Sequence, residues 1–415
     1  MSPKKQSKFT LALLLCLCLN HDTASADDYT DPVTSVVYTY DPAGTTAEVK
    51  SGEYVSWESG TEYHAGSPDA QGEIVILSKF VVDGREYKVT RIGECAFCLS
   101  QHIRSVALPP TVTSIGSMAF AGCTALSSIS MCDQLRRIGD RSFAGCHSLF
   151  SICLPEGLEA IGFEAFASCS SLNSIVLPTS LIEIGHMPFL GCDALVSIIV
   201  EKGNPKYDSR DYCNAVVETE SNKVVVGCKG TVFPPSVAAI GENAFFQCRS
   251  IEKVSIPGTV SEIGRGAFSY CSNLKEIVLS EGLKTIRNGA FWYTAPATVT
   301  IPSTVTQIEP CAFWTPSLTS VSTLISEPFD VGMICDFDHY KIKLYVPAGT
   351  IAKYERAEGW KRFSPIDEDY RLSYMQPSIS SSQQTGGIAD LQGRRLTTLP
   401  RHGLYIRDGR KYVAR

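Results

Sequence analysis

The chain is predicted to fold as a β-rich solenoid of about nine coils, because a unit of 23 residues recurs through most of it. Three columns define the unit: an Ile, a Phe five residues after it and, in six coils, a Cys eight residues after it. The Ile column consists of Ile92, Ile115, Ile138, Ile161, Ile184, Ile240, Ile263, Ile286 and Ile308. A unit this short buries its apolar side only against its neighbours, which predicts a stack.

The segment from Leu172 to Gly185 illustrates the local structure expected of each coil. Its apolar residues are separated by one or two polar ones, so no helical period is sustained. We expect a short strand, a corner at Pro178 and a second short strand, after which an Ala-Phe-x-x-Cys turn closes the coil. At the roughly 4.8 Å spacing of β-strands, nine coils give an array about 40 Å long.

The Phe and Cys columns are predicted to form the core of this array. The Phe column is complete and consists of Phe97, Phe120, Phe143, Phe166, Phe189, Phe245, Phe268, Phe291 and Phe313. The Cys column consists of Cys123, Cys146, Cys169, Cys192, Cys248 and Cys271. Equivalent Cys side chains in adjacent coils point the same way, which suits disulfides poorly. We therefore interpret the column as buried free thiols that act as small hydrophobic residues.

The N-terminus has the pattern of a signal peptide, predicted to be cleaved after Ala26. Three lysines precede the apolar stretch Phe9 to Leu19, and Ala24-Ser25-Ala26 follows. The apolar stretch is too short to span a membrane, which takes roughly 20 residues, and no later segment is long enough. A secreted or cell-surface protein is expected. Without the leader, 34 basic residues face 42 acidic ones, a net charge of −8 that argues against nucleic acid as a partner.

The remaining chain divides by composition. Residues 27–88 alternate apolar and polar residues without the repeat, and are predicted to form a β-rich N-terminal cap for the solenoid at 89–320. A C-terminal cap is expected at 321–368, with a strand at Lys343 to Pro347 and an amphipathic helix from Thr350 to Trp360 that turns Tyr354 and Trp360 inward. A linker at 369–385 leads to a basic segment at 386–415, which carries a net charge of +5.

An insertion of 33 residues interrupts the repeat between Ile184 and Ile240. Ala215 to Val217 and Val224 to Val226 read as two strands joined by a polar turn at Ser221-Asn222. We expect a hairpin at about 200–232 that leaves the solenoid. It is either a recognition loop or a structural insertion.

The search for catalytic motifs predicts a protein that is not an enzyme and that has no cofactor and no metal site. Cys95-Ala96-Phe97-Cys98 has the Cys-x-x-Cys spacing of a redox site or half a zinc site. The favoured interpretation is structural, because the motif lies in the first coil and Phe97 belongs to the Phe column. Asp336-Phe337-Asp338-His339 is interpreted as a solvated loop.

One departure from the repeat marks a candidate binding site on the C-terminal coils. In the last two coils the Cys of the column is replaced by Thr294 and Pro316. Large aromatic residues gather at the same corner: Phe246, Tyr270, Trp292, Tyr293 and Trp314. Two interpretations are open. The rings either fill the space left by the missing thiols or form an exposed strip that anchors a protein or stacks on sugar rings.

The sequence resembles the BspA-like leucine-rich-repeat family of bacterial surface proteins over about residues 30–368. The resemblance rests on the repeated Leu-Pro-x-x-Val/Leu-x-x-Ile-Gly-x-x-Ala-Phe-x-x-Cys, on Gly203-Asn204-Pro205 with Asp208-Ser209-Arg210, and on Tyr345 to Thr350 with Gly359-Trp360. It implies a leucine-rich-repeat array, a secreted or cell-surface location, and adhesion to host proteins or other bacteria. The segment from Leu391 to Ile406 is similar to C-terminal segments of exported bacterial proteins, some of which serve as sorting signals.

These observations predict a secreted or cell-surface protein that binds a macromolecular partner, a host or bacterial surface protein. The alternative is a carbohydrate-binding accessory protein that uses the aromatic strip to hold a glycan.

Overall fold

The computed structural model describes residues 26–57, 60–335 and 341–369, and strand residues 388–389, 395–396, 403–407 and 410–414. The chain divides into two compact units, Met1–Ser373 and Tyr374–Arg415. The expected signal peptide up to Ser25, residues 370–385 of the expected linker and the loop Asp336 to His339 lie outside the described residues. Among the described residues no helix has the length and apolar character needed to cross a membrane.

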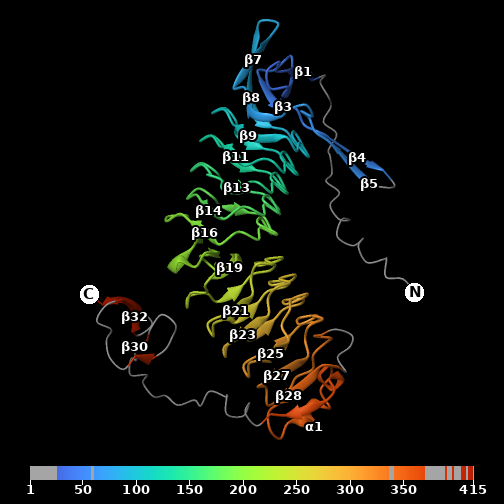
Figure 1. Cartoon of the computed structure of the whole chain (residues 1–415), viewed down its shortest axis with the longest axis vertical. Coiled ribbons are helices and arrows are strands. Elements are labelled where there is room, and N and C mark those ends of the chain that lie inside the picture. The colour runs from blue at the N-terminus through green and yellow to red at the C-terminus, as the bar shows by residue number, and fades with distance from the viewer. Residues whose placement is uncertain are drawn as a thin grey trace. The chain divides into compact units, whose positions relative to one another are not determined.

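The first unit is a β-solenoid whose successive coils pair in parallel on two sides (Figure 1). The side of longer strands consists of β6 (Gly72–Val75), β9 (Ile103–Ala107), β11 (Ser128–Ser130), β14 (Ser174–Leu177), β16 (Ser197–Val200), β21 (Lys253–Ile256), β23 (Glu276–Leu279), β25 (Thr298–Ile301), β27 (Ser320–Thr323), β28 (Lys343–Val346) and β29 (Ile366–Glu368). The side of shorter strands consists of β3 (Thr46–Val49), β8 (Arg85–Ile92), β10 (Ser114–Ile115), β12 (Arg137–Ile138), β13 (Ala160–Ile161), β15 (Glu183–Ile184), β19 (Lys223–Val226), β20 (Ala239–Ile240), β22 (Glu262–Ile263), β24 (Thr285–Ile286) and β26 (Gln307–Ile308).

The predicted register is confirmed within each half of the solenoid, where each Ile of the column pairs with the Ile of the next coil. Ile115 lies between Ile92 and Ile138, and Ile138 pairs in turn with Ile161. The stack has about 12 turns, more than the nine visible in the sequence. Strands of both caps and of the insertion continue the parallel pairing of the coils, although they lack the Ile and Phe residues of the repeat. The number of coils counted from the sequence was therefore too low.

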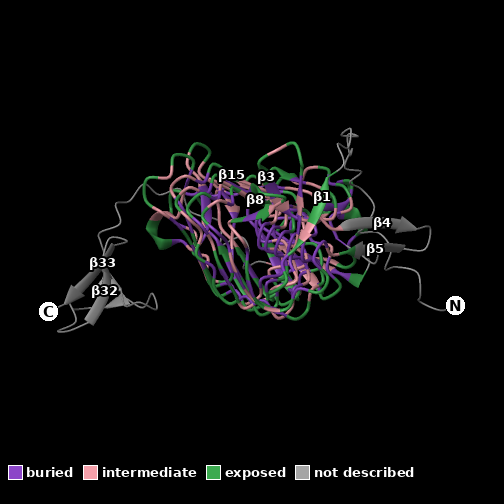
Figure 2. Ribbon diagram, turned by 90° about the horizontal axis from the view of Figure 1, so that it is seen from above, coloured by how far each residue is buried: buried purple, intermediate pink, exposed green. Residues whose placement is uncertain are grey.

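The Phe column is a continuous stack of buried rings within each half of the solenoid. The ring of Phe143 lies 5.3 Å from those of Phe120 and Phe166, with interplanar angles of 7° and 4°. All three side chains are fully buried. A view along the stack shows the buried residues gathered inside the coils and the exposed ones around them (Figure 2). The core is therefore filled by side chains along its length.

The predicted hairpin is present, since β18 (Val216–Glu218) and β19 pair antiparallel, but it joins the solenoid instead of leaving it, so its predicted placement was wrong. The insertion contains β17 (Tyr207–Asp208), a 3-10 turn at Arg210–Tyr212, and β18, followed by β19. β18 pairs antiparallel with both β17 and β19, and β19 then pairs in parallel with β20. Val216, Val217 and Val224 are fully buried. Because three valines of the insertion are apolar enough to join the core, the segment takes the place of a coil.

The two caps cover the ends of the stack. At the N-terminal end β1 (Asp27–Thr30), β2 (Val37–Tyr40) and β7 (Lys79–Val82) join the ladder of shorter strands, and β4 (Glu53–Trp57) pairs with β5 (Gly60–His64). At the C-terminal end the expected helix is only four residues long, α1 (Ile351–Tyr354), followed by a 3-10 turn at Trp360–Arg362. Tyr354 and Trp360 are fully buried, as predicted.

The second unit contains a small antiparallel sheet with the strand order β31-β30-β32-β33. Its strands are β30 (Ile388–Ala389), β31 (Arg395–Leu396), β32 (Gly403–Arg407) and β33 (Arg410–Ala414). This sheet lies in the segment for which the sequence predicts a basic, independent element.

Candidate functional site

The candidate site is built on the turn that closes each coil. In this turn the seventh residue after the Ile has a left-handed backbone, with φ of 72° at Gly122, 76° at Gly145 and 67° at Gly191. Glycine adopts this conformation without a steric penalty, whereas a bulky side chain pays one of roughly 1 kcal/mol or more. The glycines therefore fit the geometry of the turn.

Two tyrosines occupy this left-handed position in the C-terminal coils. Tyr270 has φ of 60° and Tyr293 has φ of 54°. Leu99, Ser168 and Gln247 adopt the same backbone at this position in other coils, with φ of 60°, 57° and 55°, so the left-handed conformation belongs to the turn of the repeat. Each tyrosine is fixed by the next coil, because the backbone N–H of Tyr270 donates to the Trp292 carbonyl at 2.7 Å and that of Tyr293 to the Trp314 carbonyl at 2.9 Å.

Phe246, Tyr270, Trp292 and Tyr293 form one connected group of rings, referred to here as the aromatic strip. The rings of Tyr270 and Tyr293 are parallel, 5.2 Å apart with an interplanar angle of 1°. Trp292 lies tilted beside both, at 5.8 and 5.7 Å, and Phe246 meets Tyr270 edge-on at 5.5 Å. Trp314 is half-buried in the following coil.

Exposure differs along the strip. Trp292 is 38% exposed and Tyr293 45%, whereas Phe246 and Tyr270 are half-buried. The place of the missing thiol is taken by Thr294, which is buried and donates its hydroxyl to the Phe291 carbonyl at 2.7 Å. The core beneath is therefore closed without the strip, and Trp292 and Tyr293 project from it.

The Cys column is a structural feature, as predicted. Five of the six thiols donate to the Phe carbonyl of the preceding coil, for example Cys146 Sγ to Phe120 O at 3.2 Å and Cys169 Sγ to Phe143 O at 3.2 Å. Cys248 instead lies 3.9 Å from the Ser250 hydroxyl. All the described cysteines are free thiols. Burial raises the pKa of Cys123 to about 12 and holds the pKa of Cys146 well above its ordinary value. Thiols that stay protonated are poor nucleophiles, so low reactivity is expected of the column.

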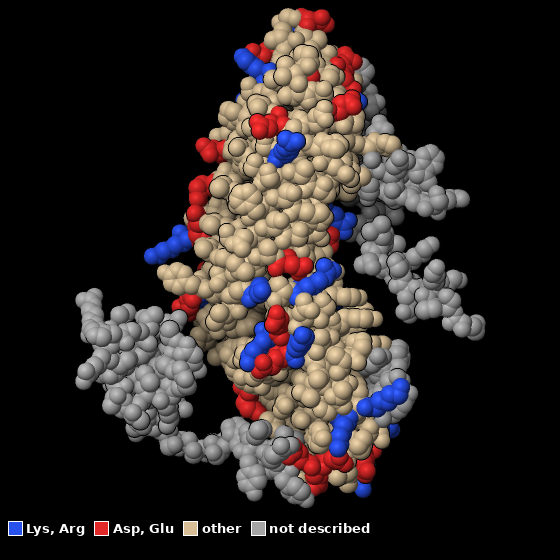
Figure 3. All heavy atoms as spheres, viewed as in Figure 1, with Lys and Arg blue, Asp and Glu red and all other residues tan. Residues whose placement is uncertain are grey.

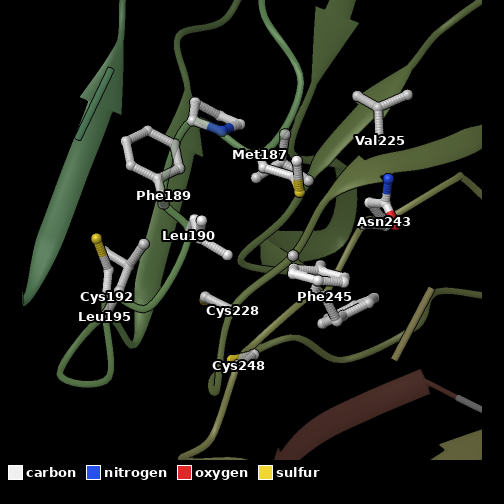
Figure 4. A pocket seen from close by; sticks show the side chains of 15 residues that line it. Met187, Phe189, Leu190, Cys192, Leu195, Val225, Cys228, Asn243, Phe245 and Cys248 are labelled. Atoms are coloured by element: carbon white, nitrogen blue, oxygen red, sulfur yellow. The ribbon is translucent and has the colours of Figure 1, made fainter. Parts of the chain in front are cut away.

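A small cavity marks the junction between the two halves of the solenoid (Figure 4). It is lined by Phe189 and Phe245, the two members of the Phe column that flank the insertion, and by Cys192, Cys228 and Cys248. The insertion supplies no Phe here; Gly227 instead lies so close to Phe245 that a Cβ would stand 2.0 Å from the ring. A volume of about 20 Å³ holds about one water molecule and no larger ligand.

On the face shown in Figure 3 the charged side chains of the described residues do not gather in one patch. The face shown in Figure 3 carries small groups of both signs separated by broad uncharged areas. Many of the ion pairs join coils; Arg287 bonds Glu262 at 3.1 Å and Glu309 at 2.8 Å. Within the described residues no group of three or more His, Cys, Asp or Glu side chains is arranged to hold a metal ion.

Comparison with known proteins identifies the family. The BspA type leucine rich repeat region matches residues 88–215 and 226–319, in six copies. The chain belongs to the BspA type leucine rich repeat family. Together the matched segments cover the regular coils and the first part of the insertion, in agreement with the resemblance seen in the motifs.

Solved structures share the fold. The pneumococcal vaccine antigen PcpA is 18% identical, with 83% of this chain and 98% of that chain covered and a TM-score of 0.57. A leucine rich cell surface protein from Faecalibacterium prausnitzii is 21% identical over 86% of this chain and 98% of that one, with a TM-score of 0.42. No curated protein sequence matches the chain.

Proposed function

We propose that this chain is a secreted or cell-surface adhesion protein that binds a host or bacterial surface protein through the aromatic strip. The observation that carries the proposal is the exposure of Trp292 and Tyr293, 38% and 45%, within one connected group of aromatic rings. Exposed Tyr and Trp side chains are the residue types most enriched where protein interfaces concentrate their binding energy.

The geometry of the strip favours a protein over a glycan. Tyr270 and Tyr293 lie parallel at 5.2 Å, so each covers a face of the other and their edges remain for a partner. Interfaces between proteins use such edges, together with the hydroxyl groups, as well as faces. A sugar ring that stacks needs a free aromatic face, and Trp292, tilted by 44° to Tyr293, is the candidate within the strip.

Family membership supports a binding role without naming the ligand. Leucine-rich repeats are scaffolds whose stacked coils present an extended surface, and each member places its recognition residues on that scaffold. The carbohydrate-binding alternative is retained as the second arm of the experiment.

The experiment compares the full chain with the double variant Trp292→Ala, Tyr293→Gly against purified extracellular-matrix proteins and a glycan array. The proposal predicts binding to a protein, with affinity reduced at least about tenfold in the double variant, which corresponds to roughly 1.4 kcal/mol or more. Phe150→Ala is the matched control, since Phe150 is 60% exposed and lies outside the strip. Equal binding by both variants, or binding to glycans alone, contradicts the proposal.

A further inference from the structure

The ladder of shorter strands and that of the closing turns are both interrupted at one boundary, referred to here as the seam. It separates the first half of the solenoid, up to β16, from the insertion and the coils that follow. The shorter strands form one sheet that ends at β15 and a second that begins with β17, and on the longer side β16 pairs with β14 alone. Within the described residues no strand pairing crosses the seam, and the Lys229 N–H donates across it to the Leu195 carbonyl at 3.3 Å.

The closing turns lose their connection at the same place. Between two regular coils, three backbone N–H groups of the turn donate to carbonyls of the next coil, as those of Glu164, Phe166 and Ser168 do at 3.1, 2.8 and 2.6 Å. In the last coil before the insertion, two of the equivalent residues are Phe189 and Gly191, both of which are buried. Their N–H groups donate to no acceptor in the part of the chain that the structure describes. Buried N–H groups are nearly always paired, so the regular stacking ends at these residues.

The hairpin of the insertion lies between two separate hydrophobic cores. Val216 and Val226 belong to the core of the first half, whereas Val217 and Val224 belong to the core of the second half. Successive side chains of a strand point to opposite faces, so each strand of the hairpin contributes to both cores. The Phe column is interrupted here by the small cavity at the junction (Figure 4). The two halves therefore meet through apolar side chains and not through a continuous sheet.

Two polar side chains of the insertion, referred to here as the clasp, connect it to the first half. The side-chain amide of Asn204 donates to the Leu181 carbonyl at 2.7 Å, and its oxygen accepts from the N–H of Tyr207 in β17 at 2.8 Å. The Ser209 hydroxyl accepts from the N–H of Val200 in β16 at 2.9 Å. Asn204 and Ser209 belong to the two motifs that mark the insertion in the sequence. The clasp therefore supplies side-chain hydrogen bonds where the backbone ladders are missing.

We propose that the seam is a joint about which the two halves of the solenoid tilt, and that Asn204 and Ser209 hold it closed. A regular interface between coils resists tilting, because backbone hydrogen bonds join its strands and its turns at once. At the seam these bonds are missing, so tilting breaks the side-chain bonds of the clasp and shifts packed apolar side chains past one another. The aromatic strip lies on the second half, so tilting changes its orientation relative to the surface of the first half.

The test measures distances between two spin labels on the full chain by pulsed electron paramagnetic resonance. One label is attached to Cys153, which is exposed on the first half, and the other to Ser255→Cys at an exposed position of β21 in the second half. The matched control pairs Cys153 with Glu73→Cys, an exposed position of β6, so that both labels lie in the first half. Mass spectrometry confirms two labels per molecule, since the other described cysteines are buried or half-buried. The joint predicts a distance distribution across the seam at least about twofold wider than that of the control pair.

Variants of the clasp test its role. Asn204→Ala with Ser209→Ala should widen the distribution across the seam further and leave that of the control pair unchanged. Ser221→Ala is the matched control variant and should have no effect on either distribution, because its hydroxyl bonds Glu218 within the hairpin at 2.6 Å.

Two results would overturn the proposal. Equal widths for the label pair across the seam and the pair within the first half would show that the solenoid has no joint at the seam. A clasp variant whose distribution across the seam equals that of wild type would show that Asn204 and Ser209 do not hold the seam closed. Neither measurement uses a partner, so both are independent of binding at the aromatic strip.

Discussion

Replacing Phe166 by Ala in the middle of the first half of the solenoid tests the stacked core most directly. The ring is fully buried, 5.3 Å from Phe143 and 5.7 Å from Phe189, and it has equivalent rings on both sides that cannot close over the gap. Large-to-small changes of this kind cost about 3–5 kcal/mol, and a site that cannot collapse belongs at the upper end of that range.

The measurement is the free energy of unfolding from denaturant titration of wild type and variant at equal protein concentration. Phe150→Ala is the matched control, because the same atoms are removed from a side chain that is 60% exposed. We expect a change below about 1 kcal/mol for the control. If the Phe166 variant changes by as little as the control, the ring column does not carry the stability of the stack.

Two further predictions concern the columns and the ion pairs. Cys146→Ala should destabilise the protein by about 1–2 kcal/mol, because it removes a buried thiol and its hydrogen bond to the Phe120 carbonyl. Cys153→Ala is the control, since Cys153 is exposed, and it should leave the free energy of unfolding in denaturant unchanged. The hydrogen bond from Arg287 lowers the pKa of Glu309 below the usual 4.5. A carboxyl group whose pKa is lower in the folded state stabilises the fold above its unfolded pKa, and this stabilisation is lost as the pH falls. The free energy of unfolding of wild type should therefore exceed that of Glu309→Gln by less and less below about pH 4.5. A difference that grows in acid contradicts the pairing.

The regular part of the fold could be predicted because every coil repeats the same residues. A column such as Ile115, Ile138 and Ile161 fixes the period and the register together, and burial of the Phe rings follows from the same columns. The same reasoning identified Cys146 and its equivalents as core residues rather than as disulfide partners. The Cys column also bonds the Phe carbonyls, which no residue pattern indicated.

The irregular parts could not be predicted, because pairing without the repeat leaves no periodic signal. Val224 pairs with Val217 in the predicted hairpin and with Ile240 in the ladder of coils, and the sequence indicated only the first of these pairings. The C-terminal cap was predicted to contain a helix of about three turns, but it has one turn of α-helix at Ile351–Tyr354 and a 3-10 turn at Trp360–Arg362, which Gly359 precedes with a left-handed φ of 82°.

The aromatic residues of the strip could be identified from the sequence, whereas the left-handed backbone of Tyr270 and Tyr293 is seen only in the structure. Position seven after the Ile is glycine in three coils, Leu99, Ser168 or Gln247 in three others, and Tyr270 and Tyr293 in late ones. That substitution pattern contained the signal, since glycine at a repeated turn position indicates a left-handed backbone. The left-handed φ values show that the tyrosines stand where side chains are disfavoured.

The central claim is that Tyr293 serves recognition and not packing, and a comparison of Tyr293→Gly with Tyr293→Ala tests it. At a φ of 54° Gly relieves the backbone strain, whereas Ala retains it, so Gly should be more stable than Ala by about 1 kcal/mol and close to wild type. Partner binding should fall in both variants. A Gly variant less stable than wild type by more than about 2 kcal/mol, with partner affinity unchanged, would show that the ring packs the fold and would contradict the claim.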